Sequence, residues 1–198
     1  MIKDRIIEQA TYFFIRDGIK NVSMDDLASS LGISKRTIYM NFKDKEDILK
    51  QCILVSEEGI KHRIHEIMDQ SGNIIDGCLQ IIDHYKYIQL PTARFWDDIY
   101  KYYPLIYQSI LDELGHNNTC LRKLLEEGIT RNYFRKNLNI DEILSSYIII
   151  SNIYSLRISF SRTDVISNIM VNMLRGISTS KGIEIIDKYI DNLPHSNN

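Results

Sequence analysis

The chain has 198 residues, of which 44% are hydrophobic and 25% are charged, with a formal net charge of −2. This length is enough to bury a substantial core, and the composition is typical of globular proteins and excludes an intrinsically disordered chain. The sequence has no apolar run long enough to span a bilayer and no signal-peptide pattern at its start, so we expect a cytoplasmic protein without a membrane partner.

The small net charge conceals a local basic cluster. Residues 1–50 hold nine Lys and Arg against eight Asp and Glu, and from Lys35 to Lys45 four bases face one acid. This distribution favours specific contact with an anion at one helix end and argues against broad coating of nucleic acid.

The first predicted helix runs from Ile2 to Asp17, and Gly18 ends it. Its apolar residues recur every three or four positions, which is the spacing of one buried helix face. We expect this helix to pack behind the two that follow and to complete a three-helix domain. The predicted stripe consists of Ile2, Ile6, Ala10 and Phe13.

The segment 22–45 has the pattern of two short helices joined by a tight turn. Ser23 stands at an N-cap position, and Asp26 three residues later can complete a capping box. Gly32 suits a left-handed turn, and Ser34 caps a second helix that reaches about Asn41. This is the pattern of a helix-turn-helix.

The second of these helices has an apolar side and a polar side. Ile38 and Phe42 fall four residues apart and are expected to face inward. The opposite surface can serve a DNA major groove, because arginine and lysine reach guanine edges and hydroxyls reach phosphate. An ordinary solvated helix face is the alternative. The residues expected on the outer side or its margins are Lys35, Arg36, Thr37, Tyr39, Met40 and Lys43.

The residues of this segment resemble the DNA-binding domain of the TetR/AcrR family of bacterial transcriptional regulators. The matching positions are Ser34, Thr37, Ile38, Tyr39, Phe42, Lys45, Glu46 and Leu49. The resemblance implies an all-α fold, with a helix-turn-helix DNA-binding domain at residues 1–46 and a helical ligand-binding and dimerisation domain at residues 47–198.

The same resemblance implies roles for single residues. The positions expected to contact chiefly the DNA backbone hold Thr37, Tyr39 and Lys45. The positions that vary with operator sequence hold Lys35, Arg36 and Met40. The predicted interface also includes the two cap residues Ser23 and Ser34. The sequence departs from the family pattern at Asn41, where histidine is usual, and at Asp25, to which we assign no DNA contact because phosphate would repel it.

A long helix is predicted from Lys45 to Met68. Four of its polar residues have spacings that could hold a metal ion: Glu58, His62, His65 and Glu66. Acid–base pairing on an exposed face is the favoured explanation, and we expect no metal. The three cysteines, which are expected as reduced thiols with a disulfide or redox switch as the alternative, are Cys52, Cys78 and Cys120.

Helices predicted at 74–90 and 93–114, broken at Pro104, carry eight aromatic residues between Tyr85 and Tyr107. A mostly apolar pocket with a few polar tips fits this composition, and so does plain core packing. Because the resembled family builds its inducer cavity from central helices, we expect a pocket for a small hydrophobic or aromatic effector. The candidate ligand-binding residues are His84, Phe95, Trp96, Tyr100, Tyr103 and Tyr107.

Helices are then predicted at 119–135, 141–160, 164–177 and 180–193. The helix at 141–160 is apolar on most sides, and a partner subunit is the natural cover for it. The resembled family also dimerises through two late helices; a fully intramolecular core is the alternative. The candidate dimer residues are Tyr147, Ile150, Tyr154, Ile158, Ile166, Met170 and Met173.

These observations favour a homodimeric, ligand-responsive regulator, typically a repressor, that binds a palindromic double-stranded DNA operator. The alternative is an all-helical adaptor or enzyme in which the helix-turn-helix is only structural. We expect no enzyme and no cofactor, because the sequence has no nucleophile elbow, phosphate loop, zinc-protease or dinucleotide motif.

Overall fold

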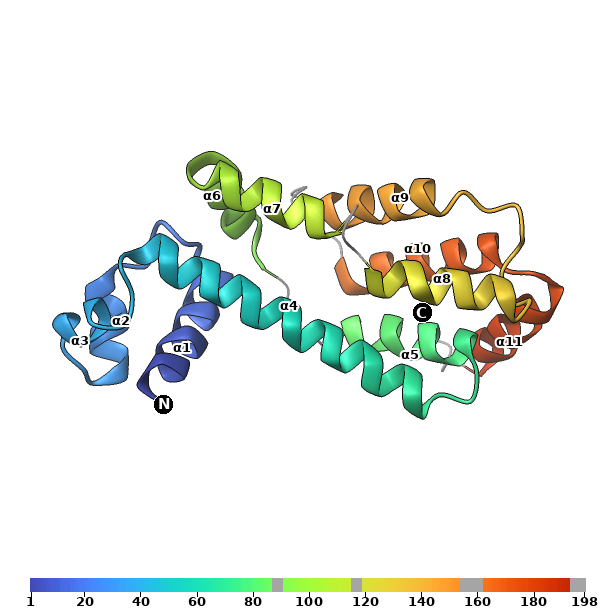
Figure 1. Ribbon diagram of the computed structural model, residues 1–198, viewed down its shortest axis with the longest axis horizontal. Coiled ribbons are helices and arrows are strands. Elements are labelled where there is room, and N and C mark those ends of the chain that lie inside the picture. Colours follow the sequence, from blue (N-terminus) through green and yellow to red (C-terminus); the bar gives the residue numbers. More distant parts are fainter. Residues whose placement is uncertain (87–90, 115–118, 154–161, 193–198) are drawn as a thin grey trace, which may run out of the picture. The chain divides into compact units, whose positions relative to one another are not determined.

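The computed structural model describes residues 1–86, 91–114, 119–153 and 162–192. These residues form eleven helices and no strand, which confirms the all-α prediction (Figure 1). The helices are α1 (Ile2–Asp17), α2 (Met24–Leu31), α3 (Lys35–Tyr39), α4 (Lys45–Gln70), α5 (Ile74–Lys86), α6 (Ala93–Tyr102), α7 (Pro104–Leu114), α8 (Thr119–Thr130), α9 (Ile140–Ile153), α10 (Arg162–Ile177) and α11 (Ser180–Asp191).

Most predicted boundaries agree with the structure to within two residues. The bounds of α1 are those predicted, and α4 extends two residues past Met68. The helix expected at 119–135 ends five residues early, because the chain turns at Asn132, whose φ is +61°. The predicted helix at 141–160 corresponds to α9 as far as Ile153, and its last residues lie outside the described ranges.

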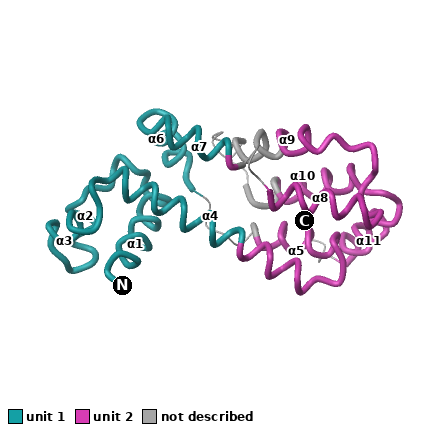
Figure 2. The backbone as a smooth tube through the Cα atoms, in the orientation of Figure 1, with its two compact units in different colours: residues 1–61, 89–112, 152–157 teal, residues 62–88, 113–151, 158–198 magenta. Residues whose placement is uncertain are grey.

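The chain divides into two units, which are coloured separately in Figure 2. Unit 1 comprises residues 1–61, 89–112 and 152–157, and unit 2 comprises residues 62–88, 113–151 and 158–198. Unit 1 therefore contains α1 to α3 together with α6 and most of α7. Its core is formed by side chains from all of these helices and from the first turns of α4, including Ile6, Phe14, Leu27, Ile38, Ile48, Leu49, Phe95 and Ile99.

The loop between α1 and α2 is held by two charged side chains from other helices of unit 1. Lys45 Nζ, at the start of α4, donates hydrogen bonds to the carbonyl oxygens of Ile19 and Val22, both at 2.9 Å. The buried Asp98 carboxylate of α6 accepts a hydrogen bond from the Lys20 backbone N–H at 2.7 Å. These contacts satisfy loop polar groups that burial of the loop removes from water.

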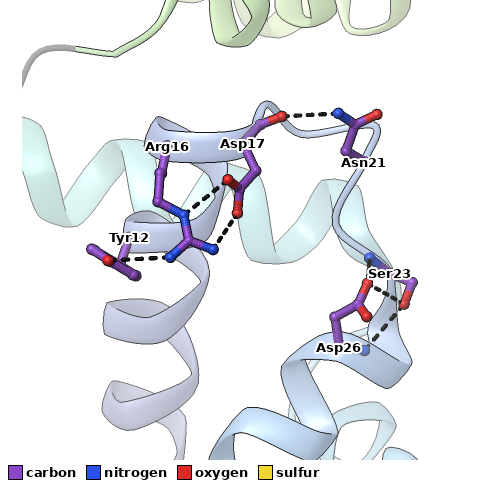
Figure 3. A network of polar contacts seen from close by, with 6 residues as sticks. All are labelled: Tyr12, Arg16, Asp17, Asn21, Ser23 and Asp26. Atoms are coloured by element: carbon purple, nitrogen blue, oxygen red, sulfur yellow. Dashed lines mark hydrogen bonds and ion pairs between the residues drawn. The ribbon is translucent and has the colours of Figure 1, made fainter.

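The end of α1 carries a second polar network, shown in Figure 3. The Arg16 guanidinium donates two hydrogen bonds to the Asp17 carboxylate, at 2.8 and 2.6 Å, and a third to the Tyr12 hydroxyl. Asn21 donates from its side chain to the Asp17 carbonyl oxygen at 3.1 Å. The hydrogen bond from Arg16 lowers the pKa of the Asp17 carboxyl group.

Unit 2 has its own core, in which α5 packs against α10 and α11. Phe134 is fully buried there and lies directly over Gly128 of α8. A Cβ at Gly128 would come within 2.1 Å of the Phe134 ring, so only glycine fits at this position without rearrangement. The core of unit 2 includes Ile75, Leu79, Leu125, Phe134, Leu144 and Ile186.

Two of the cysteines are buried thiols in these cores. Desolvation raises the pKa of Cys52 to about 11 and that of Cys78 to about 12. A thiol with so high a pKa carries almost no thiolate near neutral pH, which makes it a poor nucleophile and a poor redox partner.

No described helix has both the length and the apolar character that a membrane span requires. Within the same residues, no three His, Cys, Asp or Glu side chains cluster closely enough to hold a metal ion. His62 instead lies 3.3 Å from the Glu66 carboxylate on the same face of α4.

We predict that Asp98→Ala lowers the free energy of unfolding by about 1–3 kcal/mol, because it leaves the part-buried Lys20 N–H without its acceptor. Asp98→Asn keeps an acceptor oxygen and should cost less. Urea unfolding followed by circular dichroism measures both. Asp97→Ala, at the exposed neighbouring position, is the matched control and should stay within about 0.5 kcal/mol of wild type. Equal stability of Asp98→Ala and Asp97→Ala would contradict the prediction.

We also predict an alkaline loss of stability that depends on Cys78. Burial raises the pKa of the Cys78 thiol in the folded state. The contribution of the protonated thiol to the free energy of unfolding is therefore fully present below the unfolded-state pKa of about 8.5 and declines as the pH rises above it. Between pH 8 and pH 10, the stability of wild type relative to Cys78→Ala should fall by about 1–2 kcal/mol. Urea titrations at several pH values test this, and a constant difference would contradict burial of the thiol.

Candidate nucleic-acid interface and apolar cavity

The caps of α2 and α3 have the geometry that the sequence predicts. Ser23 Oγ accepts a hydrogen bond from the Asp26 N–H at 3.1 Å, and the Asp26 carboxylate accepts from the Ser23 N–H at 2.8 Å. Gly32 ends α2 with φ +63° and ψ +33°. Ser34 Oγ then accepts from the Thr37 N–H at 3.1 Å and so begins α3.

The short helix α3 has a buried side and an open side. Ile38 and Phe42 are at most 2% exposed, whereas Tyr39 is 50% exposed and Met40 is 78% exposed. Arg36 is exposed as well. The structure therefore confirms the predicted orientation, with apolar residues inward and a cationic, hydroxyl-bearing surface outward.

The four bases of this region differ in what surrounds them. Lys35 Nζ lies 2.8 Å from the Asp25 carboxylate of α2, and that hydrogen bond raises the lysine pKa. The side chains of Arg36 and Lys43 contact no acid or acceptor among the described residues. Lys45 is half-buried, and desolvation lowers its pKa while its ammonium holds the α1–α2 loop.

The predicted hydroxyls are engaged in caps. Ser23 Oγ lies 2.6 Å from the Asp26 carboxylate, and the Ser34 and Thr37 hydroxyls lie 2.8 Å apart. The departure at Asn41 has a structural role, because its amide donates to the Thr37 carbonyl oxygen at 2.8 Å and caps the end of α3. Contacts of these residues with DNA stay predictions.

Five of the predicted ligand-binding residues lie on α6, α7 and the turn between them, in unit 1. Phe95 is buried in the core of this unit, and Trp96, Tyr103 and Tyr107 pack around that core. Tyr100 is 68% exposed and meets the Tyr107 ring edge to face. The ligand role of these residues stays a prediction.

One polar atom in this aromatic group is unsatisfied. The indole N–H of Trp96 is buried and has no acceptor among the described residues. The sixth candidate, His84, belongs to α5 in unit 2.

Unit 2 contains a cavity of about 160 Å³ that is partly open to the surface. Its described lining comes from the end of α4, from α5 and α8 to α10, and from Phe134, and it includes no charged side chain and none of the six predicted ligand-binding residues. The lining is aliphatic and sulfur-containing with one aromatic ring: Ile64, Cys78, Ile81, Ile82, Cys120, Leu121, Leu124, Leu125, Phe134, Ile143, Met170, Met173, Leu174 and Ile177.

The predicted dimer residues lie on and after α9 and on α10. Met170 and Met173 are half-buried and line the cavity. Tyr154 and Ile158 lie outside the described residues, as do the side chains of Tyr147, Ile150 and Ile166.

Neither the role of Asp98 nor the contact of Asp25 was predicted from the sequence. A signal for Asp98 was available, because it lies on the same helix face as Phe95 and beside Ile99, and a carboxylate among apolar positions requires a donor. Asp25 gave no such signal, since its partner is ten residues away across the turn.

Residues 6–52 match the model of the family described as "Bacterial regulatory proteins, tetR family". The "HTH-type transcriptional regulator SAR2658" of Staphylococcus aureus strain MRSA252 is 30% identical over 128 residues, which cover 54% of this chain and 68% of that protein. The "Biofilm operon icaADBC HTH-type negative transcriptional regulator IcaR" of S. aureus strain Newman is 26% identical over 126 residues, which cover 58% and 68%.

The fold also has solved counterparts. A transcriptional regulator of the TetR family from Cytophaga hutchinsonii superposes with a TM-score of 0.72 at 16% identity, covering 90% of this chain and 96% of that one. Taken with the helix-turn-helix geometry and the match over two thirds of a relative's length, these likenesses show that the chain belongs to the TetR family of bacterial transcriptional regulators.

Proposed function

We propose that this TetR-family regulator binds a palindromic operator as a homodimer and acts as a cytoplasmic repressor that a small hydrophobic ligand releases from DNA. The observation that carries the proposal is the orientation of α3. Ile38 and Phe42 anchor it in the core, and Arg36, Tyr39 and Met40 face outward. The repressor assignment draws on the similar IcaR protein, whose name describes a negative regulator.

The proposal assigns DNA binding to residues 1–46 and ligand binding and dimerisation to residues 47–198. In the DNA-binding part, Arg36 is the best candidate for reading a base. Its guanidinium is exposed and has no partner among the described residues, so it can approach the two acceptors of a guanine edge without first breaking an ion pair.

The cavity of unit 2 is the proposed ligand site, in place of the six residues predicted from the sequence, none of which lines it. Its described lining offers no charged group, so a charged ligand atom placed there would lose its hydration without compensation. A cavity of about 150 Å³ with a similar aliphatic lining accommodates benzene. The size and chemistry therefore favour a neutral ligand, or a ligand segment, of roughly six carbon atoms.

The dimer interface is proposed on α9 and α10 and the residues between them. Leu144 of α9 is buried in the core of unit 2, and Met170 and Met173 of α10 line the cavity. The remaining apolar positions of the segment, from Tyr147 to Ile166, are those we assign to the partner subunit. Light scattering that gives the mass of one chain at micromolar concentration would refute this assignment.

Selection of bound sequences from a library of random DNA duplexes tests the central proposal. A homodimer with two α3 helices should enrich a two-fold symmetric site whose halves are centred about 10 base pairs, or a multiple of that, apart. An adaptor with a merely structural helix-turn-helix should enrich no sequence, and that outcome would overturn the proposed function.

We predict that Arg36→Ala weakens binding to the selected operator by about 10- to 100-fold for each half-site, because one bidentate base contact is worth about 1–3 kcal/mol. Tyr39→Phe, which removes a single hydroxyl, should weaken it less, by up to about tenfold. Fluorescence anisotropy at fixed salt measures both. Arg135→Ala removes an exposed arginine in unit 2 and serves as the matched control. Wild-type affinity of Arg36→Ala would contradict its role.

We predict that neutral alcohols bind unit 2 and that cations of the same length do not. 1-Hexanol should raise the melting temperature and release the operator, since a ligand shifts an equilibrium only if it binds the two states unequally. Hexylammonium should do neither. Ile81→Phe, which fills the cavity, should abolish the hexanol effect while circular dichroism shows a folded protein. Equal shifts with both probes, or an unchanged shift in Ile81→Phe, would place the ligand elsewhere.

A further inference from the structure

Asp25 has no part in the cap of α2, although it lies in the first turn. The capping box is formed by Ser23 and Asp26. The contact that the structure gives the Asp25 carboxylate is the ion pair with Lys35, at 2.8 Å from Nζ. An acid of α2 thus neutralises a base at the start of α3, on the surface to which DNA binding is assigned.

We propose that Asp25 is a specificity-determining residue, which pairs with Lys35 and thereby lowers the affinity of the protein for DNA of arbitrary sequence. This inference rests on the proposed DNA-binding function. It gives Asp25 a role in recognition without any attractive contact with DNA.

Sequence-independent affinity grows with the number of phosphates that Lys and Arg neutralise. Of the four bases between residues 35 and 45, Lys45 is occupied by two backbone carbonyl oxygens and Lys35 is paired with Asp25. Arg36 and Lys43 are left without an acidic partner among the described residues, so about half of the local positive charge is available to any duplex.

The pair affects operator and non-operator DNA differently. On arbitrary DNA, Lys35 gains only a phosphate contact, while it loses Asp25 and leaves that carboxylate facing a polyanion. On the operator, a base-edge acceptor within reach of Lys35 offsets the same loss. Specificity is the difference between the two binding free energies. Breaking the Asp25–Lys35 pair costs more net free energy on arbitrary DNA than on the operator, and this difference increases specificity.

Asp25 also lies near the positive end of the α2 dipole, where an acid stabilises the helix. That role alone would change the melting temperature and would leave the balance between operator and arbitrary DNA unchanged. The two roles are therefore separable by experiment.

The test compares wild type with Asp25→Asn on the selected operator and on a shuffled duplex of the same composition, across a salt series. For each subunit in contact with DNA, Asp25→Asn should bind the shuffled duplex roughly two- to fivefold more tightly, the range that an exposed ion pair supports, and should gain less on the operator. On the shuffled duplex, the slope of log K against log salt should become more negative by up to about 0.9 per subunit, the value of one additional phosphate contact.

Two further variants distinguish an effect of the Asp25–Lys35 ion pair from an effect of the change in net charge. Glu8→Gln makes the same change of net charge at an exposed position of α1 and should leave the ratio of operator to shuffled affinity unchanged. In a Lys35→Gln background, Asp25→Asn should lose most of its effect on DNA affinity, because no lysine is left for Asp25 to pair with. The four variants form a double-mutant cycle that measures the coupling between the two side chains.

An unchanged affinity ratio in Asp25→Asn would overturn the inference, and so would a full effect that persists in the Lys35→Gln background. If wild type enriches no operator at all, the proposed function fails first. If wild type enriches an operator but Asp25→Asn has the wild-type ratio of operator to shuffled affinity, only this inference is refuted.

Discussion

The arrangement of unit 1 depends on the loop between α1 and α2, whose backbone is held by Lys45 and Asp98. Lys45 donates to two loop carbonyl oxygens, and Asp98 accepts from the Lys20 N–H. Because Asp98 is buried and Lys45 is half-buried, their hydrogen bonds are costly to break, and a shift of the loop would leave these groups without their partners. The path of this loop in turn sets where α2 and α3 begin.

The same hydrogen bonds explain why α6 belongs to unit 1 although it follows α1 by more than 70 residues. Thr92 donates its N–H to the Ile15 carbonyl oxygen at 3.2 Å, and Asp98 continues the contact at the loop. Phe95 and Ile99 add apolar packing on the same core. The segment that the aromatic composition pointed to thus contributes substantially to the core beneath the DNA-binding helices.

Local features were predictable from the sequence, and distant ones were not. The caps at Ser23 and Ser34, and the inward side of α3, follow from spacings of three or four residues, so they could be predicted with accuracy. The contacts of Lys45 and Asp98 join residues 23 to 78 positions apart and depend on how helices pack. The cavity of unit 2 was equally hidden, because an aliphatic lining looks like ordinary core in a sequence.

The shortness of α3 has a consequence for its dynamics. Five residues are too few for a helix that persists alone in water, so the backbone of this segment is ordered only while Ile38 and Phe42 remain packed. Its amide hydrogens should therefore exchange with solvent through the same opening reaction as those of the surrounding core, and not through independent fraying. The order of the recognition surface therefore depends directly on the folding stability of unit 1. Any condition that destabilises the core also disorders the side chains of α3 that are proposed to contact DNA.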